Sequence, residues 1–167
     1  LDLAMKEVAR GAVALLGNHD EAAVADGPSG MNAMAATAIA WTRDRLTPAH
    51  RDFIATLPLM IEEEGRLYVH AEASAPERWR YVTDAEAARR SMEATQAHTT
   101  FCGHVHKPAL YSLGDTGKLV GFGPIAGAPV PLGRGRAWLA VAGAVGQPRD
   151  GDPSACYIMV DTAPLQA

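Results

Sequence analysis

Apolar side chains recur along the chain at two spacings, one typical of helices and one typical of buried strands. Leu1, Met5 and Val8 repeat at helical spacing and predict a helix over residues 1–9. Residues 12–16 form a continuous apolar run between glycines, which predicts a buried strand. The chain is therefore expected to open with a helix followed by a strand.

A second helical stripe follows the first glycine-rich loop. Met31, Met34, Ala38 and Trp41 recur at helical spacing and predict a helix that ends near Arg45. We expect this stripe to pack in the hydrophobic core, as apolar faces of helices usually do.

Two further helices are indicated by signals at their starts. Thr47 followed by Pro48 is typical of an N-cap with proline in the first helical turn. Residues 83–86 read Thr-Asp-Ala-Glu and predict a capping box that opens a helix ending near Ala97.

Strands dominate the rest of the chain. Residues 59–61 and 66–69 flank a turn of three glutamates and a glycine, which predicts a hairpin with a solvated turn. Later apolar runs between Gly/Pro turns predict strands at residues 99–102, 109–113, 118–122, 137–141 and 156–160. Without an internal repeat or a long linker, the chain is expected to form a single domain, residues 1–167.

Composition narrows the classes of function. Of the 167 residues, 48% are hydrophobic, enough for one domain with a substantial core. The net charge of −4 argues against a broad basic surface for nucleic acid or acidic membranes. No apolar run approaches the roughly 20 residues that span a bilayer, and two isolated cysteines indicate a reducing, cytoplasmic location. Because the first residue is not Met and already shows helical spacing, we expect the chain to be a fragment.

Side chains that can bind a metal follow three of the predicted strands. They come after residues 12–16, 66–69 and 99–102, and they are Asn18, His19, Asp20, His70, His104 and His106. Ligands of α/β sheets usually bind at the carboxyl ends of strands, so we expect these side chains to share one site. Amide, imidazole and carboxylate ligands suit Mn, Fe, Zn or Ni better than Ca.

Each histidine also has a purely structural interpretation. His50 and His98 fall in a helix and a turn, where surface exposure is more common than metal binding. Any one of the strand-end histidines could be a buried core imidazole, but three of them are harder to explain by packing. We expect Gly103 to allow a tight turn, so that His104 and His106 serve two neighbouring metals.

In this order, Gly17-Asn18-His19-Asp20, His70 and Gly103-His104-Val105-His106 resemble the motifs of the calcineurin-like metallophosphoesterase superfamily, in particular its small prokaryotic phosphodiesterase-like branch. Residues 145–152 also resemble the segment that follows the last metal motif in such proteins. The resemblance implies an α/β fold, a four-layer α/β/β/α sandwich that here lacks its first strands. It further implies a two-metal centre at one edge of the sandwich.

The resemblance implies a role for each matching residue. One metal ion would be bound by Asn18, His70 and His104. His106 would bind the other ion, and His19 would act as general acid or stabilise the transition state, with Asp20 orienting its imidazole. Manganese is the metal expected first, with Fe, Zn, Ni or Mg as alternatives.

The implied reaction is hydrolysis of phosphomonoesters or phosphodiesters by a hydroxide that bridges two metal ions. A phosphate ester is therefore the expected partner, with neither nucleic acid nor membrane as a structural partner. Arg149 is a candidate substrate contact, and a structural turn with Asp150 is the alternative. The physiological substrate and the oligomeric state stay open.

Two departures from the family pattern affect these expectations. The family's Asp-X-His and Gly-Asp-X-X-Asp motifs do not occur in residues 1–16, and Ala71 stands where Gly usually follows the central His. We therefore expect little or no activity from these 167 residues alone, and association through an open sheet edge. The alternative function is a non-catalytic scaffold or protein-binding module on the same fold.

Overall fold

A six-stranded mixed sheet forms the centre of the computed structural model, which describes residues 1–26 and 31–162. The strand order is β1-β2-β3-β6-β4-β5, in which β2, β3 and β6 run parallel and the other neighbours antiparallel. The strands are β1 (Met60–Glu63), β2 (Arg66–Val69), β3 (Thr99–Cys102), β4 (Ala109–Gly114), β5 (Leu119–Phe122) and β6 (Arg136–Val141).

The predicted hairpin and the later strands are confirmed, with one exception. Residues 156–160 form no strand, and the side chains of Tyr157 and Met159 are 75% and 83% exposed. In the described part of the chain no strand pairs with this segment. Its apolar residues therefore lack the neighbour and the buried face that would make a strand of them.

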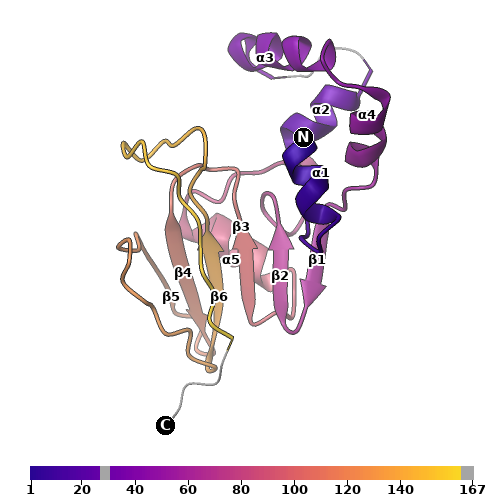
Figure 1. The fold of residues 1–167 in the computed structure, drawn as a ribbon. Helices are drawn as coiled ribbons and strands as arrows, with labels where there is room; N and C mark the ends of the chain where they lie inside the picture. The colour runs from indigo at the N-terminus through magenta and orange to yellow at the C-terminus, as the bar shows by residue number, and fades with distance from the viewer. Residues whose placement is uncertain (27–30, 163–167) are drawn as a thin grey trace.

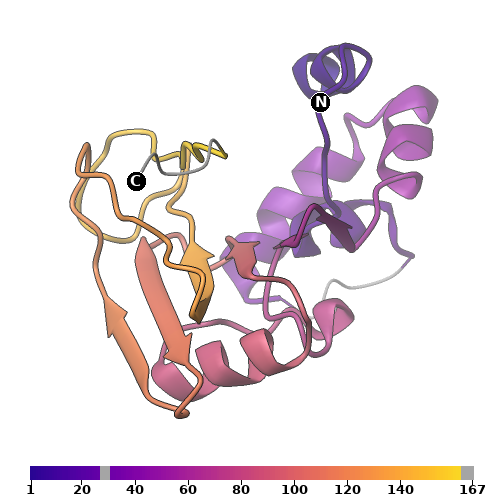
Figure 2. The same ribbon diagram turned by 90° about the horizontal axis from the view of Figure 1, so that it is seen from below.

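Helices α1–α4 gather at one side of the sheet, beyond β1, whereas α5 packs against one of its faces (Figures 1 and 2). The helices are α1 (Asp2–Val8), α2 (Asn18–Val24), α3 (Ala33–Arg43), α4 (Pro48–Ala55) and α5 (Ala85–Glu93), and η1 is a short 3-10 helix, Pro76–Arg78. Within residues 1–26 and 31–162, every helix is too short or too polar to traverse a lipid bilayer.

The predictions for residues 12–20 were wrong about secondary structure. Residues 12–16 form no strand, and Leu16 donates its N–H to the carbonyl of Pro58 rather than to a strand. Helix α2 begins at Asn18 instead, because Asp20 accepts a hydrogen bond from the N–H of Gly17 at 2.9 Å and caps the helix. Residues 27–30 of the glycine-rich loop that follows α2 lie outside the described residues.

The predicted core stripe of α3 was also wrong, although the helix itself is confirmed. Met34 and Trp41 are 82% and 59% exposed, and Ile39 is the buried residue of this helix. Arg43 fixes the orientation of α3, because its guanidinium donates to the carbonyl of Ala22 in α2 at 2.6 Å. The face of α3 that carries Met34 and Trp41 is therefore not the face turned toward α2.

The signal at Thr47 is confirmed, since its side chain accepts a hydrogen bond from the N–H of His50 at the start of α4. The signal at residues 83–86 is shifted by one residue. Asp84, with extended backbone, is the N-cap of α5 and accepts from Ala87 at 2.9 Å, and the helix ends at Glu93.

The hydrophobic core lies between α5 and the sheet, where Ala88 and Met92 pack with Val69, Leu139 and Val141. A smaller apolar cluster around Trp138 occupies the opposite face. The predicted α/β class is confirmed, and the described residues supply one sheet with its helical layer.

Candidate metal centre

Three predicted ligands meet where α2 begins and where β2 and β3 end. Asn18 is the first residue of α2, His70 follows β2, and His104 lies just beyond β3. The Nε2 atom of His70 lies 3.1 Å from Asn18 Oδ1 and 3.2 Å from His104 Nδ1. Strands β2 and β3 are parallel neighbours, and Gly103 donates its N–H to the carbonyl of His70, which holds their carboxyl ends together.

The spacing of these three donor atoms suits a single cation. Ligands about 2.1 Å from a metal are separated from one another by about 3.0 Å in octahedral and about 3.4 Å in tetrahedral geometry. In the part of the chain that the structure describes, no three His, Cys, Asp or Glu side chains gather as a metal site, so the amide of Asn18 is needed to complete a set of three. One amide oxygen and two imidazole nitrogens fit a first-row divalent metal.

Backbone carbonyls orient two of the imidazoles and fix their tautomers. His104 Nε2 lies 2.9 Å from the carbonyl of Trp79, and His106 Nδ1 lies 2.8 Å from the carbonyl of Gln147. Because a carbonyl only accepts, each of these ring nitrogens carries the proton. The lone pairs are therefore on Nδ1 of His104, which faces His70, and on Nε2 of His106. Carbonyl-bound imidazoles of this kind are typical of histidines that bind metals.

Burial keeps the two central histidines neutral. Burial, with smaller contributions from the nearby His106 and His19, lowers the pKa of His70 to about 4. Burial also lowers the pKa of His104 to about 4, with repulsion from His70 second and the Trp79 carbonyl acting in the opposite direction. Both imidazoles can therefore offer a lone pair to a cation at neutral pH.

The backbone of the site takes an unusual conformation. Trp79, His104 and His106 have φ angles of 51°, 63° and 61°, and with Glu64 they are the non-glycine residues of positive φ in the described chain. The expected tight turn is present, because Val105 donates its N–H to the carbonyl of Gly103 at 2.7 Å, but the positive φ falls on the histidines and not on this glycine. Left-handed backbone at non-glycine residues costs about 1–3 kcal/mol each and tends to concentrate at functional sites.

Gly17 allows α2 to begin directly against the histidines. A Cβ at this position would lie 3.1 Å from Asp20 Oδ2 and 3.2 Å from His70 Cε1. The hydrogen bond that Asp20 makes to Gly17 caps the helix, and burial raises the pKa of the Asp20 carboxyl. His19 is exposed in the same first turn, and the idea that Asp20 orients it stays a prediction.

The remaining candidates differ in whether they lie near the trio, as we call Asn18, His70 and His104. His106 and Arg149 are close enough to His104 to lower its pKa, and Arg149 donates its N–H to the carbonyl of His106 at 3.0 Å. Substrate contact by Arg149 stays a prediction. His50 interacts with Asp2, and His98 with Gly133 and Thr99, so neither joins the site.

Sequence reasoning missed the aromatic residues that surround the histidines. The ring of Tyr81 stacks on His104 at 4.1 Å between centroids, and Trp79 meets His70 edge-on at 5.7 Å. The indole N–H of Trp79 also donates to Glu21 of α2 at 2.7 Å. Two aromatic residues close after the central histidine were the available signal, but a loop sequence does not reveal where such rings point.

Known proteins are similar to this chain over most of its length. The calcineurin-like phosphoesterase superfamily domain matches residues 3–164. An uncharacterised protein of Methanocaldococcus jannaschii is 29% identical over 154 residues, which cover 89% of this chain and 60% of that protein. The crystal structure of a metallophosphoesterase from Sphaerobacter thermophilus is similar with a TM-score of 0.72 and 28% identity, covering 89% of this chain and 62% of that one. The chain thus spans about three fifths of the length of these relatives.

Proposed function

The chain belongs to the calcineurin-like phosphoesterase superfamily, and from this premise we propose that it serves metal-dependent hydrolysis of phosphomonoesters or phosphodiesters. The observation that carries the proposal is the meeting of Asn18, His70 and His104 at ligand spacing. A cytoplasmic location, suggested by free Cys102 and Cys156, is part of the same proposal.

In this proposal the chain's own residues divide between holding metal and handling the substrate. Asn18, His70 and His104 would hold one divalent ion, with manganese our first choice, and His106 would serve a second. Such ions supply Lewis-acid polarisation of the phosphoryl group and a water activated at neutral pH.

His19 would give a proton to the leaving oxygen or stabilise its charge. Its exposed position in the first turn of α2 leaves the imidazole accessible to a substrate. Arg149 would add a positive charge near the phosphate ester.

The test combines turnover with metal binding. In the whole protein that contains this chain, we expect His104→Ala to abolish both Mn²⁺-dependent hydrolysis of bis(p-nitrophenyl) phosphate and Mn²⁺ binding measured by calorimetry. In His19→Ala we expect hydrolysis to fall by about 100-fold, the usual scale for a general acid, with Mn²⁺ binding retained. Wild-type activity in both variants would remove these assignments.

A second candidate, a non-catalytic binding module, is favoured by the composition of the donor set. In the described residues, the trio supplies an amide and two imidazoles but no carboxylate, and the histidines and acids alone form no metal site. A whole protein that binds one Mn²⁺ tightly but hydrolyses neither a phosphomonoester nor a phosphodiester would support this candidate.

A further inference from the structure

The candidate metal centre is assembled from two separate parts of the chain. Asn18 and His19 come from α2, in the helical group beyond β1, whereas the other histidines follow strands of the sheet (Figure 1). Helix α2 packs on α3 and α4. The position of Asn18 relative to His70 and His104 therefore depends on what holds α2 against the loops at the sheet edge.

One side-chain hydrogen bond connects α2 to the loop after β2. The indole N–H of Trp79 donates to Glu21 Oε2 at 2.7 Å. Glu21 lies three residues after Asn18 in the same helix, so both side chains project from one face. The bond thus restrains α2 on the side from which Asn18 reaches His70.

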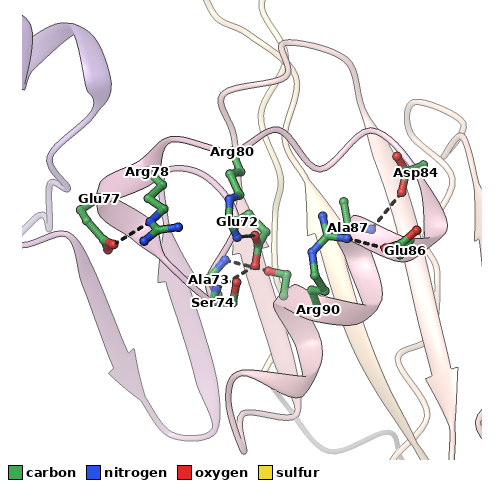
Figure 3. Close-up of polar contacts among 11 residues, drawn as sticks. Glu72, Ala73, Ser74, Glu77, Arg78, Arg80, Asp84, Glu86, Ala87 and Arg90 are labelled. Carbon is green, nitrogen blue, oxygen red and sulfur yellow. Dashed lines mark hydrogen bonds and ion pairs between the residues drawn. The ribbon is translucent and has the colours of Figure 1, made fainter.

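The loop that carries Trp79 is fastened at its base (Figure 3). Glu72 donates its N–H to the carbonyl of Arg80 at 3.1 Å, and the two side chains form an ion pair at 3.6 Å. The fully buried Glu72 carboxylate also accepts from the N–H of Ser74 at 2.9 Å. Ala73 donates to the hydroxyl of Ser91, which ties the loop to α5. A loop closed in this way is a fixed support for its aromatic residue.

Three different groups of Trp79 each contact one of the three segments that carry the proposed metal ligands. Its carbonyl accepts from His104 Nε2, its ring meets His70, and its indole N–H reaches Glu21 in the helix of Asn18. Trp79 makes these contacts from a left-handed backbone, with φ 51° and ψ 38°. Strain held at a residue with several specific contacts is typical of a functional position.

We propose that Trp79 is a positioning residue of the metal centre, and that its hydrogen bond to Glu21 is a latch holding Asn18 in register with His70 and His104. This inference rests on the proposed function, because it gives the latch its purpose. With the latch broken, the helix would carry Asn18 away from the histidines part of the time, and the cation would lose a ligand.

The experiment is a double-mutant cycle of Trp79→Phe and Glu21→Ala, read by calorimetric titration of the metal-stripped protein with MnCl₂. We expect each single variant to raise the Kd for Mn²⁺ about fivefold, as suits an exposed hydrogen bond to a charged group, and the double variant to raise it no further. Glu21→Gln keeps an oxygen acceptor and is expected to stay within about twofold of wild type. Trp41→Phe, at an exposed tryptophan of α3, is the matched control and should leave the Kd unchanged.

A second measurement needs no metal. In the metal-stripped protein, hydrogen exchange of the α2 amides should be faster in both Trp79→Phe and Glu21→Ala and unchanged in Trp41→Phe. A Glu21→Gln variant as weak as Glu21→Ala would show that the carboxylate acts through its charge and would overturn the latch, as would additive effects in the cycle.

The outcomes separate the latch from the function. If wild-type protein binds no Mn²⁺, the proposed metal function fails and the positioning role falls with it, even where hydrogen exchange shows a purely structural tie. If wild type binds Mn²⁺ and the variants bind it equally well, the function stands and only the latch is removed.

Discussion

Acidification should destabilise the metal-free protein through His70 and His104. Burial lowers the pKa of each imidazole to about 4 from its ordinary value of 6.5. Between about pH 6.5 and pH 4, the two histidines are therefore protonated in the unfolded chain but still neutral in the folded chain. The stabilising contribution is complete above pH 6.5 and is lost as the pH falls through this window.

The magnitude follows from the displacement of the pKa. A difference of 6.5 − 4 = 2.5 units corresponds to about 3 kcal/mol for one imidazole at about 1.4 kcal/mol per unit. The two histidines repel each other, so the pair loses less than twice this amount. Burial raises the pKa of Asp20, which acts in the opposite direction by favouring the folded state at low pH. A net loss of about 3–5 kcal/mol is a large part of the 5–15 kcal/mol typical of a domain.

The assay is urea unfolding followed by circular dichroism in EDTA, at several pH values between 7 and 4. We expect the free energy of unfolding to fall across this range in wild type, and to fall about half as steeply in His104→Gln. Trp41→Phe, which changes no titratable group at an exposed position of α3, should keep the wild-type slope. Equal slopes in wild type and His104→Gln would refute the reasoning.

Two further predictions concern backbone positions. Gly17→Ala places a methyl group 3.2 Å from His70 Cε1 and should weaken Mn²⁺ binding at least several-fold in a calorimetric titration. Gly133→Ala, whose methyl group would point into open space, should not weaken it. Equal Mn²⁺ affinity in both variants would show that α2 can shift without cost. Asp84→Ala should lower the free energy of unfolding by about 1 kcal/mol, because it removes the cap of α5. Thr83→Ala should keep the free energy of unfolding within about 0.5 kcal/mol of wild type. The reverse order of the two variants in urea melts would restore Thr83 as the cap.

The sequence was most informative where local chemistry decides the structure. The hairpin around the glutamate turn, the cap at Thr47 and the strand that ends at Cys102 follow from short-range rules. The meeting of Asn18, His70 and His104 was also predictable, because two of these residues end neighbouring parallel strands.

Sequence reasoning failed where tertiary context decides. The apolar run at residues 12–16 has no strand beside it in the described chain, and the Met34–Trp41 stripe faces solvent because Arg43 turns α3 the other way. The contacts of Trp79 could not be predicted, since they depend on a left-handed backbone at a residue for which that conformation is uncommon.

The left-handed histidines have a consequence for how a cation would be taken up. Between them Val105 packs against the hydrophobic core and so anchors the turn that carries both imidazoles. Folding alone thus completes the unfavourable backbone arrangement at these two histidines before an ion arrives. The affinity for the ion then depends on packing in the hydrophobic core. Substitutions of core residues that contact no ligand should therefore change the rate at which a bound ion dissociates.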